Sequence, residues 1–487
     1  MKVTTRIYLA GIGILVMTIS ACSNSYRYSQ LFGRDSDNNS EGGGGGIVVD
    51  KNELEIIQEK YDNLPWEYNG KPVTITLAHW NDNGEATEKA VINALLEGFY
   101  NRYPSIKVEA TYLPDYENTY GNNLQAGKVN DVFLVPDGAF SSWASSNKLT
   151  NLQPFIDASN ILDLSNVFPT ALTRYQFNPE RKRAGSGTQL SLPKDIGPMV
   201  MYYNKNLFAK YNVPLPPNDR IMTLDEALTM WQALTQYENG KAVCYGVGGL
   251  SIEGLVWSAG GDFLDESRDH FPTNPTTLAG LKKGYQFMQD SYVTHHIQPP
   301  SSWTAGSKPS DLFTSQRVAT LISGRSDVAS FRTGLGFDWD VTYVPAFEEN
   351  PLKNTYSGSV GYSIYSGIDN AKKEAAWKLV EYIASREGQE ILTATGFQIP
   401  VYSDLAVAPD IVNRETANNR APQNYECFVE SAMHQSYGLW QYRETQTWKT
   451  LGYDTESEKL YADDPSDRIT VDTFLNNVKN KIGQYLT

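Results

Sequence analysis

The stretch LSLPKDIGPMVMYYNKNLFAKYNVPLPP, residues 190–217, decides the fold. Leu190 to Pro193 is a short apolar run that ends at a proline, and a second apolar and aromatic run follows Pro198. Short apolar runs bounded by turn residues are typical of strands. The charged pair Lys194–Asp195 lies between them, in a loop from which side chains can point into a cleft. Taken alone, this loop is equally well explained as a solvated turn.

Strand and helix patterns alternate before this stretch. Residues 73–78 alternate as a strand that delivers Trp80 to its end, a helical pattern follows over 90–99, and 106–110 predict a second strand. This βαβ unit implies a parallel sheet with ligands at the carboxyl ends of its strands. Trp80 lies at such an end, and Asp137 ends the next buried strand that the sequence predicts.

The second half of the chain continues the mixed pattern. Thr223 and Glu226 form a capping box that begins an amphipathic helix, and a final helix is predicted over 471–486. The paired glycines that end at Gly261 permit a close backbone approach beside Trp257 and Asp262. The whole chain therefore favours an α/β fold.

The first 47 residues predict export and a tether. A basic start and an apolar run over 7–19 make residues 1–21 a signal peptide. The small residues at its end are followed at once by Cys22, which predicts a lipid-modified cysteine rather than an ordinary cleaved signal. Residues 22–47 are polar and contain five consecutive glycines, so we expect a flexible tether.

Length and charge limit the possible partners. A chain of 487 residues is too long for one ordinary core, so two or more packed bodies are expected. The net charge is −15, and removal of residues 1–21 takes away Lys2 and Arg6 and no acid, which gives −17. An acidic body lacks the basic surface that nucleic acids or anionic lipids require. We therefore expect no nucleic-acid partner and attachment to the membrane through the lipid alone.

The cysteines and histidines give no strong sign of a cofactor. With Cys22 lipidated, Cys244 and Cys427 remain, and the sequence leaves open whether they form a disulfide or stay free. His295–His296 is the only histidine pair, and adjacent residues on a strand point to opposite faces. A metal-binding surface lipoprotein is therefore the weaker alternative, and we expect no metal and no cofactor.

A secreted glycoside hydrolase is a second alternative. Asp262, Asp265 and Glu266 lie close together in the sequence, and glycosidases need two carboxyl groups on either side of the bond. Neighbouring acids in one loop do not establish that geometry, and Asp265–Glu266 fit a solvated turn better. We therefore expect no catalytic residues and no enzymatic activity.

The order of the motifs resembles one family, the extracellular solute-binding proteins of ABC importers, and specifically its large sugar-binding lipoproteins. The resemblance spans most of residues 73–402. It is carried by ISAC at 19–22, VTITLAHW at 73–80, DVFLVPD at 131–137, LPKDIGPMVMYYNKNLF at 192–208, WSAGGDFLD at 257–265, FTSQRVATLISG at 313–324 and SVGYSIYSGIDNAKKEAAWKLVEYIASREGQE at 359–390. Each motif is loose by itself, but seven in this order are specific.

The resemblance implies a two-lobe clamshell of the type II periplasmic-binding-protein class, with the lobes connected by a hinge. Lobe 1 would use 73–187 and 346–402, and lobe 2 would use 190–343 and 403–487. A monomer of this kind captures a carbohydrate, with an oligosaccharide favoured, and delivers it to the permease subunits of an ABC transporter. The lipid would hold it at the cell membrane, on the extracellular or periplasmic side. A surface receptor that presents its ligand to a sensor would use the same clamshell.

The chemistry of sugars predicts the types of residue at the site. A sugar ring has flat C–H faces and hydroxyl edges, so it needs aromatic plates together with carboxylate, amide and guanidinium groups. Trp80 and Trp257 are the candidate plates, and Arg325 is the candidate donor after a predicted strand. The candidate hydroxyl acceptors are Asp137, Asp195 and Asp262, and Tyr362 and Gly261 are further candidates.

One loop departs from the family pattern. Many members have Gly-Pro-Trp where this chain has Gly324-Arg325-Ser326, so a stacking surface is missing there. Arg325 would instead suit an acidic sugar. Trp440, within 403–440, is a further candidate plate.

Overall fold

The structure is a computed structural model that describes residues 49, 51–80, 85–300, 303, 307–434, 436–438, 441–442 and 447–486. All of these residues belong to one compact unit, which spans 45–487. The signal peptide, Cys22, the tether and Trp440 lie outside the described residues.

A five-stranded sheet forms the centre of the first lobe. Its strand order is β2 (Ile106–Leu113), β1 (Val73–Trp80), β3 (Val132–Pro136), β15 (Val360–Ile364) and β7 (Leu192–Pro193). Strand β1 runs parallel to both β2 and β3, which confirms the predicted βαβ unit. Strand β15 enters the sheet antiparallel to β3 and β7, at a position far along the chain.

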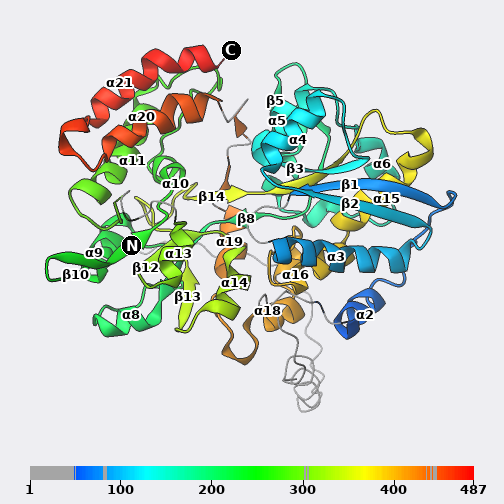
Figure 1. Cartoon of the computed structure of the whole chain (residues 1–487), viewed down its shortest axis with the longest axis horizontal. Coiled ribbons are helices and arrows are strands. Elements are labelled where there is room, and N and C mark those ends of the chain that lie inside the picture. The colour runs from blue at the N-terminus through cyan, green and yellow to red at the C-terminus, as the bar shows by residue number, and fades with distance from the viewer. Residues whose placement is uncertain are drawn as a thin grey trace, which may run out of the picture. The chain divides into compact units, whose positions relative to one another are not determined.

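Helices cover both faces of this sheet (Figure 1). They are α2 (Lys51–Glu59), α3 (Glu85–Arg102), α4 (Tyr116–Gln125), α5 (Asp137–Ser145), α6 (Gln153–Ala158), α15 (Asn370–Ala384) and α16 (Arg386–Ala394). Helix α3 ends before Pro104, because a proline disfavours helix in the residue before it. A small sheet of β4 (Gln176–Asn178), β5 (Arg183–Ala184) and β6 (Thr188–Gln189) precedes β7 in the chain.

A second five-stranded sheet forms the centre of the second lobe. Its order is β10 (Gln236–Glu238), β11 (Lys241–Gly248), β12 (Val318–Ser323), β9 (Val200–Asn204) and β13 (Trp339–Thr342). Strands β11 and β12 are parallel, and β9 is antiparallel to both of its neighbours. Every residue of β9 is buried, which explains its unbroken apolar and aromatic pattern.

The remaining helices lie mainly in the second lobe. They are α7 (Pro169–Thr173), α8 (Lys205–Lys210), α9 (Leu224–Leu234), α10 (Ile252–Ser258), α11 (Pro275–Val293), α13 (Pro309–Thr314), α14 (Asp327–Gly334), α17 (Ser403–Ala406), α18 (Pro409–Thr416), α19 (Glu426–His434), α20 (Thr455–Ser457) and α21 (Val471–Ile482), with a π-helical turn at Trp448–Asp454. The capping box at Thr223 and the terminal helix are both present as predicted. Within the described ranges, no helix combines the length and the apolar run that a membrane crossing requires.

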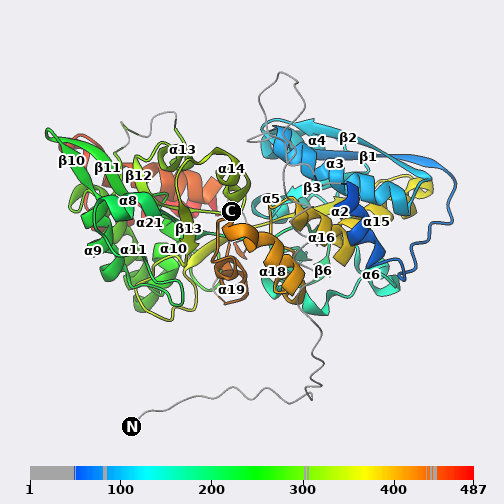
Figure 2. The same ribbon diagram turned by 90° about the horizontal axis from the view of Figure 1, so that it is seen from below.

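A third, three-stranded sheet joins the two lobes. It consists of β16 (Ser436–Tyr437), β14 (Thr355–Gly358) and β8 (Gly197–Pro198), and it lies between the two larger sheets in Figure 1. Figure 2 shows the same separation of the lobes from below, with α19 between them. The chain crosses at residues 194–199 and returns at 355–359. The first crossing begins four residues after the boundary expected at 187–190, and the return begins nine residues after the boundary expected at 343–346.

Each lobe has its own hydrophobic core, and these cores fix the partition of the chain. One cluster of buried residues surrounds the first sheet, and separate clusters lie on the two faces of the second. Residues 399–432 pack against the second sheet, so the chain leaves the first lobe after α16. Cys244 and Cys427 are both buried and both free, which answers the question that the sequence left open.

Candidate functional site

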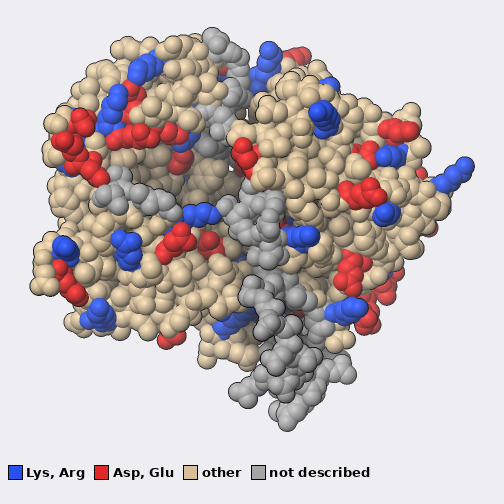
Figure 3. Space-filling model, viewed as in Figure 1, with Lys and Arg blue, Asp and Glu red and all other residues tan. Residues whose placement is uncertain are grey.

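A cavity of about 930 Å³ lies where the ends of the first-lobe strands, the crossing segments and the end of β12 converge. The first lobe contributes Trp80, Glu88, Glu117, Pro136, Asp137, Phe397 and Gln398; the crossing segments contribute Asp195, Ile196, Gly197, Met199, Tyr356, Gly358, Ser359 and Val360; and the second lobe contributes Gly249, 308–311, 322–327 and Ser330. The face in Figure 3 is hollowed between the lobes, and acidic and basic residues are interspersed around the hollow. A volume of this size is typical of pockets that enclose small molecules.

Trp80 provides an aromatic surface in this cavity. It is the last residue of β1, and its half-buried side chain lines the wall at the carboxyl end of the strand. The ring stands edge-on to that of His79, with 6.2 Å between ring centroids. Its Nε1 has no hydrogen-bond partner among the described residues. Trp80 therefore offers an aromatic ring and a free N–H donor.

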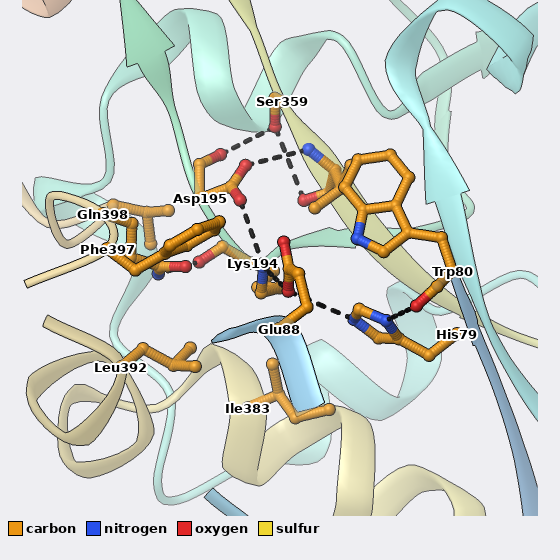
Figure 4. Close-up of polar contacts among 12 residues, drawn as sticks. His79, Trp80, Glu88, Lys194, Asp195, Ser359, Ile383, Leu392, Phe397 and Gln398 are labelled. Carbon is orange, nitrogen blue, oxygen red and sulfur yellow. Dashed lines mark hydrogen bonds and ion pairs between the residues drawn. The ribbon is translucent and has the colours of Figure 1, made fainter. Parts of the chain in front are cut away.

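Beneath Trp80, a buried lysine lies between two carboxylates (Figure 4). The Lys194 ammonium is fully buried, 3.4 Å from Asp195 Oδ2 and 3.7 Å from Glu88 Oε2. Burial alone would lower the pKa of Lys194, but Glu88 and Asp195 outweigh it and raise the pKa. Burial raises the pKa of Asp195, against the opposing effect of Lys194. In the predicted charged loop, Lys194 is therefore buried and Asp195 lines the cavity.

His79 completes this group from below. Burial and the nearby Lys194 lower the pKa of His79 to about 3, so its imidazole is neutral at pH 7. Its Nδ1 lies 2.9 Å from the carbonyl oxygen of Trp80 and must donate to it. Its Nε2 then carries no proton and faces Glu88 Oε2 at 3.9 Å. Neither His79 nitrogen can therefore donate a hydrogen bond to Glu88.

Asp137 occupies the predicted position at the end of β3, as the first residue of α5. Its Oδ2 accepts a hydrogen bond from Arg174 Nη1 at 2.7 Å, and both side chains are buried. Burial raises the pKa of Asp137 to about 6, although the Arg174 guanidinium opposes the shift. This carboxyl group therefore changes charge near neutral pH while it lines the cavity.

Arg325 lines the cavity from the second lobe, at the end of β12. Its side chain is 1 % exposed, forms an ion pair with Glu415, and lies over the rings of Tyr425 and Phe428 at 5.4 and 5.3 Å. Although burial would raise the pKa of Glu415, Arg325 and Arg332 hold it at about 2. Nε and Nη1 of Arg325 have no hydrogen-bond partner among the described residues. The guanidinium is therefore held rigidly with two donors unused.

Three predicted site residues lie together elsewhere in the second lobe. Trp257 is 4 % exposed in a hydrophobic core, and its Nε1 donates to Tyr442 at 3.4 Å. Gly261 lies against α11, where an added Cβ would be 2.3 Å from Leu281 N. Asp262 accepts hydrogen bonds from Arg268 and Tyr442. None of the three lines the cavity that the described residues form.

Tyr362 and the acids proposed for hydrolysis also lie apart from the cavity. Tyr362 is fully buried in β15, with its ring 6.1 Å from that of His79. Asp265 accepts hydrogen bonds from Ser267 Oγ and from the N–H groups of residues 269 and 270, which confirms the predicted turn.

Glu88 is the main cavity residue that the sequence reasoning missed, and a signal for it exists. It precedes Ile92, Leu95 and Phe99 by four, seven and eleven residues, so it lies on the apolar face of α3. A charged residue on a helix stripe that faces the core is rarely buried without a partner or a function. Phe397 and Gln398, by contrast, lie in a loop whose sequence gives no such signal.

Comparison with known proteins identifies the family. The model of the bacterial extracellular solute-binding protein family matches residues 94–419. The sn-glycerol-3-phosphate-binding periplasmic protein of Rhizobium meliloti (strain 1021) is 22 % identical over 331 residues, which cover 63 % of this chain and 72 % of that protein. The galactooligosaccharide-binding protein of Bacillus subtilis (strain 168) is 24 % identical over 240 residues, or 46 % of this chain and 52 % of that protein.

A solved structure shares the fold. An ABC substrate-binding protein of Listeria monocytogenes, in complex with cycloalternan, superposes with a TM-score of 0.69 at 20 % identity. The match covers 85 % of this chain and 98 % of that one. The likeness establishes the two-lobe fold.

Proposed function

The chain belongs to the family of bacterial extracellular solute-binding proteins, and from this premise we propose that it captures a carbohydrate and delivers it to the permease of an ABC transporter. The observation that carries the proposal is one cavity whose lining includes the half-buried Trp80 ring and the carboxylates of Glu88 and Asp195. An aromatic face with adjacent carboxylates matches the apolar face and hydroxyl edge of a sugar ring.

Trp80, Asp137, Asp195 and Arg325 are the ligand contacts that we propose. The first three belong to the first lobe and to the crossing segment, and Arg325 belongs to the second lobe. A ligand that contacts both lobes binds the closed arrangement better than an open one and shifts the population toward it. We propose that Nε and Nη1 of Arg325, which have no partner among the described residues, donate to ligand oxygens, while Glu415, shared with Arg332, holds the guanidinium in place.

The proposed location is the outer face of the cell membrane. The family is extracellular, and Cys22 follows small residues at the end of the predicted signal peptide. We propose that Cys22 carries a lipid, that residues 22–47 act as a tether, and that the protein works as a monomer. A Cys22→Ala variant should leave the membrane fraction and lose the lipid mass at its N-terminus. A variant that stays in the membrane would contradict the anchor.

The ligand class is tested by thermal unfolding of the lipid-free chain, residues 23–487, with neutral mono- and oligosaccharides, acidic sugars, sn-glycerol 3-phosphate and peptides. A ligand that binds only the folded state raises the Tm by mass action. We expect a shift with a neutral saccharide that Trp80→Ala abolishes. Trp66→Ala is the control, because Trp66 is also half-buried in the first lobe but lies outside the cavity. If peptides shift the Tm and no saccharide does, the proposal is wrong.

A further inference from the structure

Two carboxylates share one ammonium group at the floor of the cavity. Glu88 and Asp195 lie on either side of Lys194, and the neighbouring His79 is neutral at pH 7. By formal charge, one ammonium and two carboxylates give the cluster a net charge of −1. Lys194 is fully buried, whereas Glu88 and Asp195 both line the cavity. The ligand therefore meets the carboxylates and not the ammonium.

This floor also has hydrogen-bond acceptors that lack a close donor. Glu88 is 6 % exposed, and its Oε2 faces the Lys194 ammonium at 3.7 Å, with no closer donor among the described residues. Gln398 is 3 % exposed and donates from Nε2 to the carbonyl oxygen of Lys194 at 2.8 Å. Its Oε1 is left without a partner in the described part of the chain. Because buried acceptors without donors cost free energy, a group that donates hydrogen bonds is expected from the ligand.

The arrangement in Figure 4 indicates where that group would bind. Glu88 lies between Asp195 and Trp80 in this view, below the indole ring. Trp80 Nε1 has no acceptor among the described residues, and Trp80 lines the same cavity as these carboxylates. A hydroxyl group can donate to a carboxylate and accept from the indole N–H, whereas a carboxylate or a phosphate dianion of the ligand can only accept.

The basic residues of the cavity wall do not come from the floor that Glu88 and Asp195 form. Among the residues that the structure describes, six acidic and two basic residues line the cavity. The two basic residues, Lys308 and Arg325, come from the second lobe, whereas Glu88 belongs to the first, and Arg325 shares the single carboxylate of Glu415 with Arg332. Two like charges about 4 Å apart in a partly buried site repel strongly enough to weaken binding by about 100-fold or more.

We propose that Glu88 and Asp195 form a subsite that selects uncharged, hydroxyl-bearing sugar units and excludes phosphorylated or carboxylated ones. This subsite rests on the proposed function and adds a specificity determinant to it. It also predicts that this chain differs in ligand preference from the relative named for binding sn-glycerol 3-phosphate, which is 22 % identical to it. Glu88 is the residue that determines the specificity, and Lys194 neutralises one of the two carboxylates.

The test compares ligands that differ only in charge. Calorimetric titration of residues 23–487 at pH 7.5 and low salt would use glucose, glucuronate and glucose 6-phosphate, and the corresponding galactose set. Maltose with maltobionate, lactose with lactobionate, and sn-glycerol 3-phosphate extend the panel. For each neutral sugar that binds, we expect its charged forms to bind about 100-fold more weakly or not at all. Saturable binding of a charged form as tight as that of its neutral counterpart would overturn the subsite.

Variants identify the residue responsible. Glu88→Gln should reduce the ratio of neutral to charged affinity about tenfold, because it removes the net negative charge of the cluster. Glu97→Gln is the matched control, since Glu97 is an exposed residue of the same helix and should leave the ratio unchanged. An unchanged ratio in folded Glu88→Gln would assign the selectivity elsewhere. The comparison of ligands on the unmodified chain stands even if that variant does not fold.

The two possible failures are distinguishable. If neutral and charged sugars bind equally, carbohydrate capture stands and the charge-selective subsite is wrong. If no sugar of either kind binds, carbohydrate capture is wrong and the subsite fails with it.

Discussion

Replacement of Glu415 by glutamine tests how the second lobe holds Arg325 in the cavity. Glu415 belongs to α18, is 2 % exposed, and accepts hydrogen bonds from both Arg325 and Arg332. Arg332 also donates to the carbonyl oxygen of Glu415 at 2.8 Å. The substitution removes the single negative charge between two buried guanidinium groups while it keeps the shape of the side chain.

The expected cost follows from the pKa of Glu415. A pKa of about 2 in the folded state, against the ordinary 4.5, corresponds to about 3 kcal/mol of stability at neutral pH. Breaking a buried ion pair by removing one partner typically costs about 3–5 kcal/mol. We therefore expect Glu415→Gln to lower the free energy of unfolding by about 3–4 kcal/mol at pH 7. The affinity for saccharide should fall as well, because Arg325 loses its anchor.

The pH dependence gives an independent check. Because the folded pKa lies below the unfolded one, this stabilisation is complete above about pH 5 and is lost as the pH falls toward 2. Urea unfolding of both chains across pH 3–7 should therefore show a gap that narrows in acid. Glu426→Gln, an exposed acid at the start of the neighbouring α19, should change stability by less than about 0.5 kcal/mol. The reasoning is refuted if Glu415→Gln lowers the free energy of unfolding by less than about 1 kcal/mol. It is also refuted if the difference in the free energy of unfolding between the two chains does not change with pH.

Three further predictions concern individual residues. Cys244 and Cys427 are free and buried, so a thiol reagent should label neither in the folded lipid-free chain and both after denaturation, and a reductant should not change the Tm. Gly261→Ala should lower the free energy of unfolding in urea by about 2–3 kcal/mol, because the new Cβ would approach Leu281 N to 2.3 Å. The Kd of the folded variant for saccharide should not change. A change in Kd without a loss of stability would indicate that Gly261 contacts the ligand. Asp137 has a pKa of about 6, so its carboxylate is protonated between pH 7 and pH 5 and becomes a weaker hydrogen-bond acceptor. The affinity for saccharide, measured by calorimetry, should fall about threefold to tenfold over this range. In Asp137→Asn the affinity should not change with pH.

Local sequence patterns predicted most of the helices and strands, because the residues that determine each of them are close together in the chain. The unbroken apolar run before Asp137 is β3, the apolar stripe after Glu88 is α3, and the capping box at Thr223 begins α9. The place where the chain returns to the first lobe had no such signal. It depends on the pairing of β15 with β3 and β7, which joins segments far apart in the sequence.

Some of the predicted residues line the cavity and others do not, for physical reasons that differ between residues. Trp80 and Asp137 line the cavity because the carboxyl ends of parallel strands meet at one edge of the sheet. Trp257 also has an acid and paired glycines nearby in the sequence but packs into a core, which its aromatic surface suits equally well. The paired glycines do allow a close backbone approach, but the approach is to α11.

The burial of Lys194 could not be predicted from the sequence. A lysine next to an aspartate between two strands is normally a solvated turn, yet here the ammonium is fully buried. Its second carboxylate, Glu88, lies more than a hundred residues earlier in the chain. A buried charge is acceptable only with such a partner, and that partner becomes visible only when α3 packs beside the crossing segment.

Carbohydrate capture in the cavity of Trp80 is tested most directly by the crystal structure of residues 23–487 with the saccharide that gives the largest thermal shift. We predict a sugar ring against the face of Trp80, with hydroxyl groups hydrogen-bonded to Glu88 and Asp195. A sugar bound instead beside Trp257 and Asp262, with the cavity of Trp80 unoccupied, would contradict the central claim.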